Sequence, residues 1–279
     1  MTRIFFLLTA LALLPLSFFP QAATAEKPTI HTLIPPIPAS RYDTVYRESD
    51  EGLEKHRLFL WQGGFRYTVY TYHSYTPKKL KPGKKNPAVV LLRGARRSGI
   101  VMAEKWKKSA DRHGIRVFAP TGQAGQWFHG KDADKGLAAD QLDNNMAAKL
   151  IEKIKNDNSV DPARIYIFGH SDGAVAALRI GAAQSENLAA VAIHAGYIYD
   201  EDHLAAIRAA KRKIPHCLFI GTRDRVFPID QVHYAAELIA DEGHDTLVTE
   251  IEGHNHWYYT LAEWINEKAW NCMTRKAEL

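Results

Sequence analysis

Residues 164–184 read Arg-Ile-Tyr-Ile-Phe-Gly-His-Ser-Asp-Gly-Ala-Val-Ala-Ala-Leu-Arg-Ile-Gly-Ala-Ala-Gln, and this stretch decides the fold. The apolar run 164–168 predicts a strand, and residues 173–184 predict a helix. The turn between them has the pattern Gly-x-Ser-x-Gly, with Ser171 at its centre. A serine in such a turn is strained and exposed, and the helix N-terminus behind it favours negative charge. The pattern therefore predicts that Ser171 is a nucleophile; the alternative is a glycine-rich turn with a capping serine.

Strand and helix patterns alternate on both sides of this turn. The apolar runs predict strands over residues 87–92, 115–119, 164–168, 188–194, 217–220 and 246–251, and helices over 101–113, 138–156, 173–184, 204–210, 230–241 and 259–270. Such units form an open, mostly parallel central sheet with helices on both faces. Residues 56–60 and 65–72 flank Gln62-Gly63-Gly64, which predicts an N-terminal antiparallel hairpin at the sheet edge. The short connection between His194 and Cys217 leaves no room for a large lid.

The chain divides into three predicted parts. Residues 1–25 have the features of a signal peptide: a positive start, an apolar run over 4–19 and the small-x-small site Ala23-Thr24-Ala25. Residues 26–44 form a Pro-rich extended arm, and residues 45–279 a single domain. We therefore expect a secreted or periplasmic protein without a stable membrane anchor after cleavage; retention of the apolar run as an anchor is the alternative.

Composition excludes some partners and leaves others open. The formal net charge is only +5, and the basic stretch 78–85 contains no aromatic residue, so we expect no nucleic-acid binding. The two cysteines, Cys217 and Cys272, are predicted on a strand and on the last helix. In an exported protein they form a disulfide, or they are two buried free thiols. The sequence does not predict an oligomeric state.

Two further loops follow predicted strands and carry groups that complement a serine. Asp224 follows the strand 217–220, where a carboxylate can orient an imidazole; Asp172 and Asp230 are competing acids. His256 follows the strand 246–251 at a loop tip, and His254 competes with it as the base. Ser171, Asp224 and His256 each lie just beyond a separate strand, at the sheet edge where active residues of such folds gather.

The loop after strand 87–92 is the predicted source of an oxyanion donor. The backbone N–H of Asp172 is the first donor expected, and that of Ala95 the second. Trp127 is a candidate wall of the acyl site, with a core tryptophan as the alternative. Arg93 is a candidate substrate-binding residue, or else pairs with an acidic neighbour.

At these residues the sequence resembles the α/β-hydrolase superfamily, and more narrowly the secreted polyhydroxybutyrate depolymerase and feruloyl or acetylxylan esterase-like group. The matching stretches are Tyr67-Thr68-Val69-Tyr70, Leu91-Leu92-Arg93-Gly94, Gln126-Trp127-Phe128, the acidic segment 140–145, and Asp161-Pro162-Ala163-Arg164-Ile165-Tyr166 leading into the serine turn. The group's usual His-Gly is Arg93-Gly94 here, and arginine cannot act as a neutral partner.

The resemblance implies the α/β-hydrolase fold and a serine esterase that needs neither metal nor cofactor. The expected substrates are carboxylic esters, including polysaccharide-linked feruloyl or acetyl groups and polyesters. A peptidase with the same triad and an inactive binding protein on the same fold are the alternatives. The intact Ser171, Asp224 and His256 argue against the inactive protein.

Overall fold

The computed structural model of the chain describes residues 26–42, 48–63, 66–78, 80, 83–122, 127 and 139–275. The predicted signal peptide therefore lies outside the described residues, as do Gln126 and Phe128 of the resemblance.

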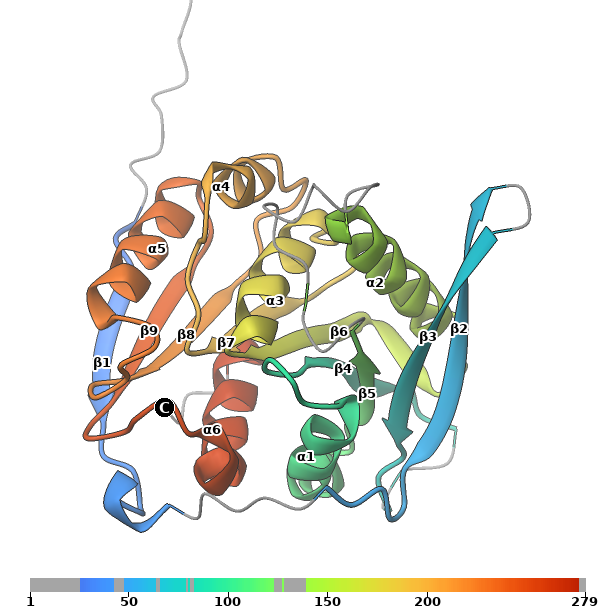
Figure 1. Cartoon of the computed structure of the whole chain (residues 1–279), viewed down its shortest axis with the longest axis horizontal. Coiled ribbons are helices and arrows are strands. Elements are labelled where there is room, and N and C mark those ends of the chain that lie inside the picture. Colours follow the sequence, from blue (N-terminus) through green and yellow to red (C-terminus); the bar gives the residue numbers. More distant parts are fainter. Residues whose placement is uncertain are drawn as a thin grey trace, which may run out of the picture.

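Within the described residues, nine strands form one sheet in the order β1-β9-β8-β7-β6-β4-β5-β3-β2 (Figure 1). Pairing is parallel from β1 to β5 along this order, and antiparallel for β5 with β3 and for β3 with β2. The strands are β1 Thr29–Leu33, β2 Glu54–Gly63, β3 Arg66–Tyr75, β4 Asn86–Leu92, β5 Arg116–Thr121, β6 Val160–His170, β7 Ala190–His194, β8 His216–Gly221 and β9 Thr246–Ile251. This is the predicted mostly parallel sheet with an antiparallel hairpin at one edge.

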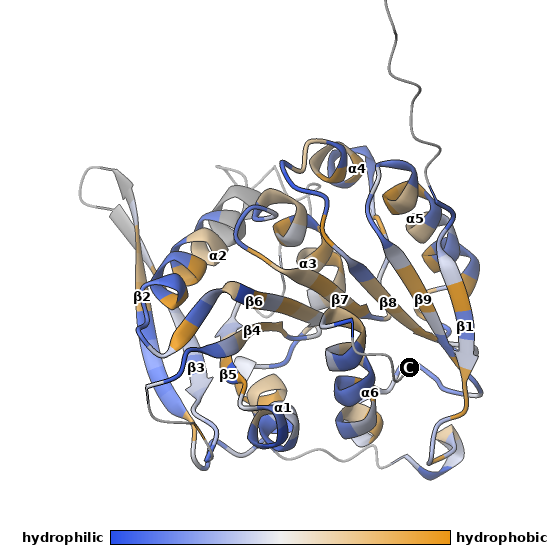
Figure 2. Cartoon of the chain, turned by 180° about the vertical axis from the view of Figure 1, so that it is seen from behind, coloured by the Kyte–Doolittle hydropathy of each residue, from blue (hydrophilic) through white to orange (hydrophobic). Residues whose placement is uncertain are grey.

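Helices cover both faces of the sheet, and each face has its own apolar core. One layer contains α1 and α6, and the other contains α2, α3, α4 and α5 (Figures 1 and 2). The central strands are buried on both sides, as β4 and β7 illustrate, which explains their continuous apolar runs. The helices are α1 Gly99–His113, α2 Ala139–Lys155, α3 Asp172–Ala183, α4 Glu201–Arg208, α5 Ile229–Asp241 and α6 Tyr258–Met273, with a short 3-10 helix, η1, at Ala39–Arg41.

Local sequence explains where α1 ends and how short the connection between β7 and β8 is. Gly114 follows α1 in the left-handed conformation, with φ 68° and ψ 38°, so the helix ends where glycine was expected to end it. The interval between β7 and β8 contains only the eight-residue α4, in agreement with the absence of a large lid from this connection.

The N-terminal arm pairs with the sheet, which the sequence did not indicate. Its residues Thr29–Leu33 form β1, which lies parallel to β9 from Thr29↔Leu247 to Leu33↔Ile251. Residues Thr29–Leu33 of the arm are extended, but they add an edge strand to the fold instead of only leading into it, and Ala39–Arg41 of the same arm form η1 (Figure 1).

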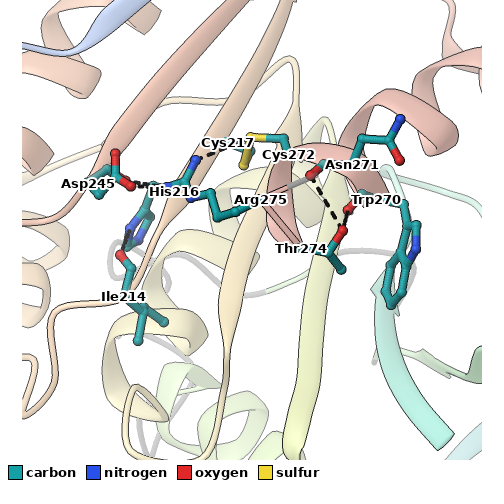
Figure 3. Close-up of a disulfide and its surroundings, with 9 residues drawn as sticks. All are labelled: Ile214, His216, Cys217, Asp245, Trp270, Asn271, Cys272, Thr274 and Arg275. Atoms are coloured by element: carbon teal, nitrogen blue, oxygen red, sulfur yellow. Dashed lines mark hydrogen bonds and ion pairs between the residues drawn. A yellow bond between two sulfur atoms is a disulfide. The ribbon is translucent and has the colours of Figure 1, made fainter. Parts of the chain in front are cut away.

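A disulfide joins Cys217 on β8 to Cys272 on α6, with 6.2 Å between their Cα atoms (Figure 3). Of the two states that the sequence left open, the structure has the bridge. The ion pair of Arg275 with Asp245, at 2.5 Å, lies beside it and holds the end of α6 near the start of β9. No helix in the described part of the chain has the length and apolarity needed to cross a bilayer.

Candidate active site

Ser171 sits in a tight turn between β6 and α3. Its φ of 56° and ψ of −123° are unusual for a residue with a side chain. Two glycines make this turn possible. A Cβ on Gly169 would lie 2.1 Å from the Gly173 carbonyl oxygen, and one on Gly173 would lie 2.2 Å from that of Leu92. The Gly-x-Ser-x-Gly pattern therefore reflects backbones that pack without room for side chains, as predicted for a strained serine turn.

The side chains of Ser171, His256 and Asp224 form one line of hydrogen bonds. His256 Nε2 lies 2.9 Å from Ser171 Oγ, and His256 Nδ1 lies 2.8 Å from Asp224 Oδ2. The ionised Asp224 only accepts, so it selects the Nδ1–H tautomer and leaves the Nε2 lone pair facing the serine hydroxyl. His256 can therefore accept the hydroxyl proton of Ser171.

The Asp224 carboxylate is fully buried but well supported. Its Oδ1 accepts hydrogen bonds from the backbone N–H groups of Val226, at 2.8 Å, and Phe227, at 3.0 Å. Burial alone would raise the pKa of Asp224, but the bonds from His256, Phe227 and Val226 outweigh it and hold that pKa below its usual value. Asp224 therefore stays anionic, and its negative charge stabilises the cation that forms on His256 when it takes up a proton.

The competing residues lie elsewhere. The His254 ring is fully buried and bonds to His194 and Tyr42 instead of the serine. Asp230 lies in the first turn of α5, and the Asp172 carboxylate accepts from the backbone of Trp127 at 2.8 Å.

The loop between β4 and α1 lies against the serine. A Cβ on Gly94 would lie 3.5 Å from the Ser171 Cβ, so the next residue, Ala95, is at the edge of the site. Arg96, the following residue, has a left-handed φ of 57°, which turns the chain sharply at this point. The two predicted oxyanion donors, the N–H groups of Ala95 and Asp172, thus belong to segments that meet at Ser171.

Arg93 and Trp127 do not fit the expectation that they contact substrate, because both are buried, with 0% and 1% of their surface exposed. The Arg93 guanidinium lies 3.7 Å from the Asp172 carboxylate and 5.0 Å from the centre of the Trp127 ring. Trp127 Nε1 donates to the Arg93 carbonyl oxygen at 2.8 Å. Through these contacts, the two residues support Asp172, which directly follows Ser171. The alternatives of an acidic partner for Arg93 and a core position for Trp127 describe them better.

Aromatic residues that no sequence motif marks flank His256. The Phe227 ring stacks on the His256 ring, with centroids 5.6 Å apart and planes at 16°. Tyr197 contacts Phe227 edge-on at 5.3 Å, and Tyr199 stacks on Tyr197 at 6.3 Å. These three residues, which we call the aromatic row, come from the loops after β7 and β8. Their position after strands of the active edge was the only available signal.

The sequence profile of the phospholipase/carboxylesterase family matches residues 100–266, more than half of the chain. The chain belongs to this family of α/β-hydrolases. No curated protein sequence matches it. The narrower likeness to polyhydroxybutyrate depolymerases and feruloyl esterases is not established by the family match.

Solved structures share the fold at low sequence identity. A thermostable esterase is 20% identical, with a TM-score of 0.62, over 81% of this chain and 63% of that one. A putative dipeptidyl aminopeptidase IV from Bacteroides ovatus is 13% identical, with a TM-score of 0.61, over 80% of this chain and 35% of that one. A ferulic acid esterase is 16% identical, with a TM-score of 0.56, over 80% of this chain and 97% of that one. The chain thus spans less than two thirds of the length of the first two structures, which contain further sequence outside the shared fold.

Proposed function

We propose that this family member is a serine esterase that hydrolyses carboxylic esters through an acyl-enzyme. The observation that carries the proposal is the line of hydrogen bonds from Ser171 through His256 to Asp224 at the tip of the strained turn. Nucleophile, base and acid in this arrangement are what acyl transfer through a serine requires.

The first half-reaction acylates the serine. His256 Nε2 takes the Ser171 proton as Oγ bonds to the ester carbonyl carbon, and the backbone N–H groups of Asp172 and Ala95 stabilise the oxyanion. Collapse of the tetrahedral intermediate breaks the bond to the alkoxide, which leaves as the alcohol after His256 protonates it. Water then attacks the acyl-enzyme with His256 again as base, and the acid and free Ser171 are released.

The aromatic row supports esters of aromatic acids as the substrate class. Phe227 and Tyr197 are partly buried and Tyr199 is 45% exposed, so the row leads outward from His256. Planar rings favour stacking with one another at distances of this kind. A feruloyl group attached to a polysaccharide fits such a surface, whereas acetyl esters and aliphatic polyesters gain less from it.

Export is part of the proposal. Residues 1–25 have the pattern of a signal peptide, and the Cys217–Cys272 disulfide suits an oxidising compartment. A secreted or periplasmic esterase on polymer-linked esters is consistent with both features.

Replacement of the nucleophile tests the reaction. Ser171→Ala should lower the turnover of p-nitrophenyl acetate by about 10⁶-fold and abolish labelling by a fluorophosphonate, while the exposed Ser49→Ala control keeps both. Wild-type turnover by Ser171→Ala would refute the assignment, and an unlabelled wild-type protein would favour the inactive binding protein.

A substrate panel tests the class. Activity on feruloyl esters above acetyl-sugar, hydroxybutyrate and peptide substrates is expected. A preference for peptides would favour the peptidase alternative, because the dipeptidyl aminopeptidase named above has the same fold. Phe227→Ala should lower kcat/KM for feruloyl relative to acetyl esters by about three- to ten-fold, the value of one aromatic contact. An unchanged ratio would exclude the aromatic row from substrate binding.

A further inference from the structure

Behind the catalytic line, four side chains form a second, separate chain of hydrogen bonds. Tyr42 Oη lies 2.6 Å from His254 Nδ1, His254 Nε2 lies 2.9 Å from His194 Nε2, and His194 Nδ1 lies 3.0 Å from His170 Nδ1. The three histidine rings are buried, with no more than 3% of their surface exposed. The proposed ester hydrolysis does not use any of these four groups as an acid, base or nucleophile.

The three histidines of this chain come from segments that carry or contact the catalytic residues. His170 directly precedes Ser171, and His254 lies two residues before His256. His194 is the last residue of β7, the strand next to β6, and its carbonyl oxygen accepts from the Ser171 N–H at 3.0 Å. The chain therefore connects the loop of the nucleophile with the loop of the base.

His254 also holds the loop of the acid. Its carbonyl oxygen accepts from the Arg223 N–H at 2.9 Å, next to Asp224. A Cβ on Gly221 would lie 2.3 Å from the same oxygen, so the two backbones are in close contact. Movement of His254 would consequently displace both His256, the partner of the Ser171 hydroxyl, and Asp224, the partner of His256.

Tyr42 brings in the N-terminal segment. It follows η1 and is anchored by β1, which pairs with β9 just before the loop of His254. Its ring contacts the His254 ring edge-on, with centroids 5.4 Å apart. Tyr42 thus connects the N-terminal segment that contains β1 and η1 to the far end of the histidine chain.

The chain is built for neutral rings. A neutral imidazole has one N–H donor and one acceptor, so His194 and His254 can each donate once and accept once along the line. Burial is the main cause that lowers the pKa of His170 and His194 well below the usual value and that of His254 to about 4. The charged and titratable groups that face these rings are His256, Asp224, Arg97, Tyr258 and Tyr259. Of these groups, Asp224 alone carries a negative charge that would favour a protonated ring. A neutral His170 ring, 5.1 Å from the His256 ring, places no like charge beside the cation that turnover creates.

We propose that Tyr42, His254, His194 and His170 are positioning residues, whose neutral hydrogen-bonded chain fixes the loops of Ser171, Asp224 and His256 relative to one another. The inference rests on the proposed esterase function. It makes the N-terminal segment a working part of the active site although Tyr42 does not touch the reacting groups.

Removal of one oxygen atom tests the chain. Tyr42→Phe should lower kcat for p-nitrophenyl acetate by about ten-fold with KM changed less than two-fold, because substrate binding is left intact while the loop of His256 loosens. Tyr234→Phe, an exposed tyrosine on α5, is the matched control and should keep kcat. His194→Phe should lower kcat further, and His194→Gln, which can donate and accept, should recover part of the loss.

Two kinetic results would overturn the proposal: a kcat within two-fold of wild type for Tyr42→Phe, or equal rates for His194→Phe and His194→Gln. If the His194 variants fail to fold, the kcat of Tyr42→Phe alone decides the matter. Nitrogen-15 spectra of the histidines in the Ser171→Ala protein need no turnover. They therefore test the positioning chain even if the esterase proposal fails. Neutral His194 and His254 at pH 6, with His256 resonances that shift on adding Tyr42→Phe, are expected. A charged His254, or His256 resonances indifferent to Tyr42→Phe, would also overturn it.

Discussion

Lowering the pH from 7 to 5 should destabilise the fold, because His216 and His254 are buried as neutral rings. Burial, together with the nearby His244, lowers the pKa of His216 to about 3, and burial lowers that of His254 to about 4. In the unfolded chain both take up a proton near the ordinary histidine pKa of about 6.5. The unfolded state therefore binds more protons than the folded state in this window, so stability rises with pH.

The magnitude follows from these values. The contribution of each ring is fully present above about pH 6.5 and is lost as the pH falls from there toward the folded pKa. Between pH 7 and 5 the loss is about 2 kcal/mol per ring, or about 4 kcal/mol for both. His170 and His194, whose pKa values are also lowered, act in the same direction. The carboxylates with lowered pKa values, such as Asp224 and Glu267, lose their contribution only at lower pH.

Urea unfolding at a series of pH values measures this effect. The free energy of unfolding should fall by at least about 4 kcal/mol from pH 7 to 5, with an uptake of two or more protons near pH 5.5. His216→Gln should reduce that uptake by about one proton, whatever it does to stability at pH 7. A free energy of unfolding that stays within about 1 kcal/mol across the range would refute the neutral burial of these rings.

Three other changes have expected outcomes. Gly173→Ala forces a Cβ against the Leu92 carbonyl and should cost about 3 kcal/mol of stability and most of the esterase activity, measured by urea unfolding and nitrophenyl acetate turnover; a fully active, equally stable variant would contradict the packing argument. Reduction of Cys217–Cys272, which closes a loop with a sequence separation of 55, should cost about 4 kcal/mol, seen as a lower Tm with reductant; an unchanged Tm would count against a structural bridge. Asp224→Asn should lower kcat by about 10⁴-fold through the wrong His256 tautomer, the effect known from chymotrypsin-type enzymes, whereas Asp230→Asn should not; similar rates for the two variants would show that Asp224 does not orient His256.

The alternation of apolar strands with helices was enough to predict the sheet, because buried parallel strands and amphipathic helices leave strong local patterns. The strand β1 left no such pattern. Three of its five residues are exposed, its segment is rich in proline, and its partner β9 lies more than 200 residues away. Pairing of this kind depends on which sheet edge is open in the folded chain, and no local pattern records that.

The site shows the same division between local and long-range information. The serine turn is local, and its glycines mark it. The assignment of Arg93 and Trp127 to substrate binding relied on their place after strands, which fixes the edge of the sheet but not the direction of a side chain. Both side chains are buried: the Arg93 guanidinium lies against the Asp172 carboxylate, and the Trp127 indole donates to the Arg93 carbonyl oxygen. The partner of an arginine buried in this way becomes evident only when the segments of residues 93, 127 and 172 meet.

The buried histidines link the stability of this fold to the organisation of its site. A hydrophobic residue in place of His254 or His194 would remove the acid sensitivity of that position, since it cannot bind a proton in the unfolded state. It would also leave the neighbouring ring nitrogens without partners in a buried place, at a cost of about 1–3 kcal/mol each. The hydrogen-bonded histidine chain is therefore a unit: replacing one member alone destabilises the fold more than replacing all of its members together, because single replacements leave buried groups without partners. Its energetic effect has to be measured with double variants of Tyr42 and His194, whose coupling should be well above the few tenths of a kcal/mol found for independent sites.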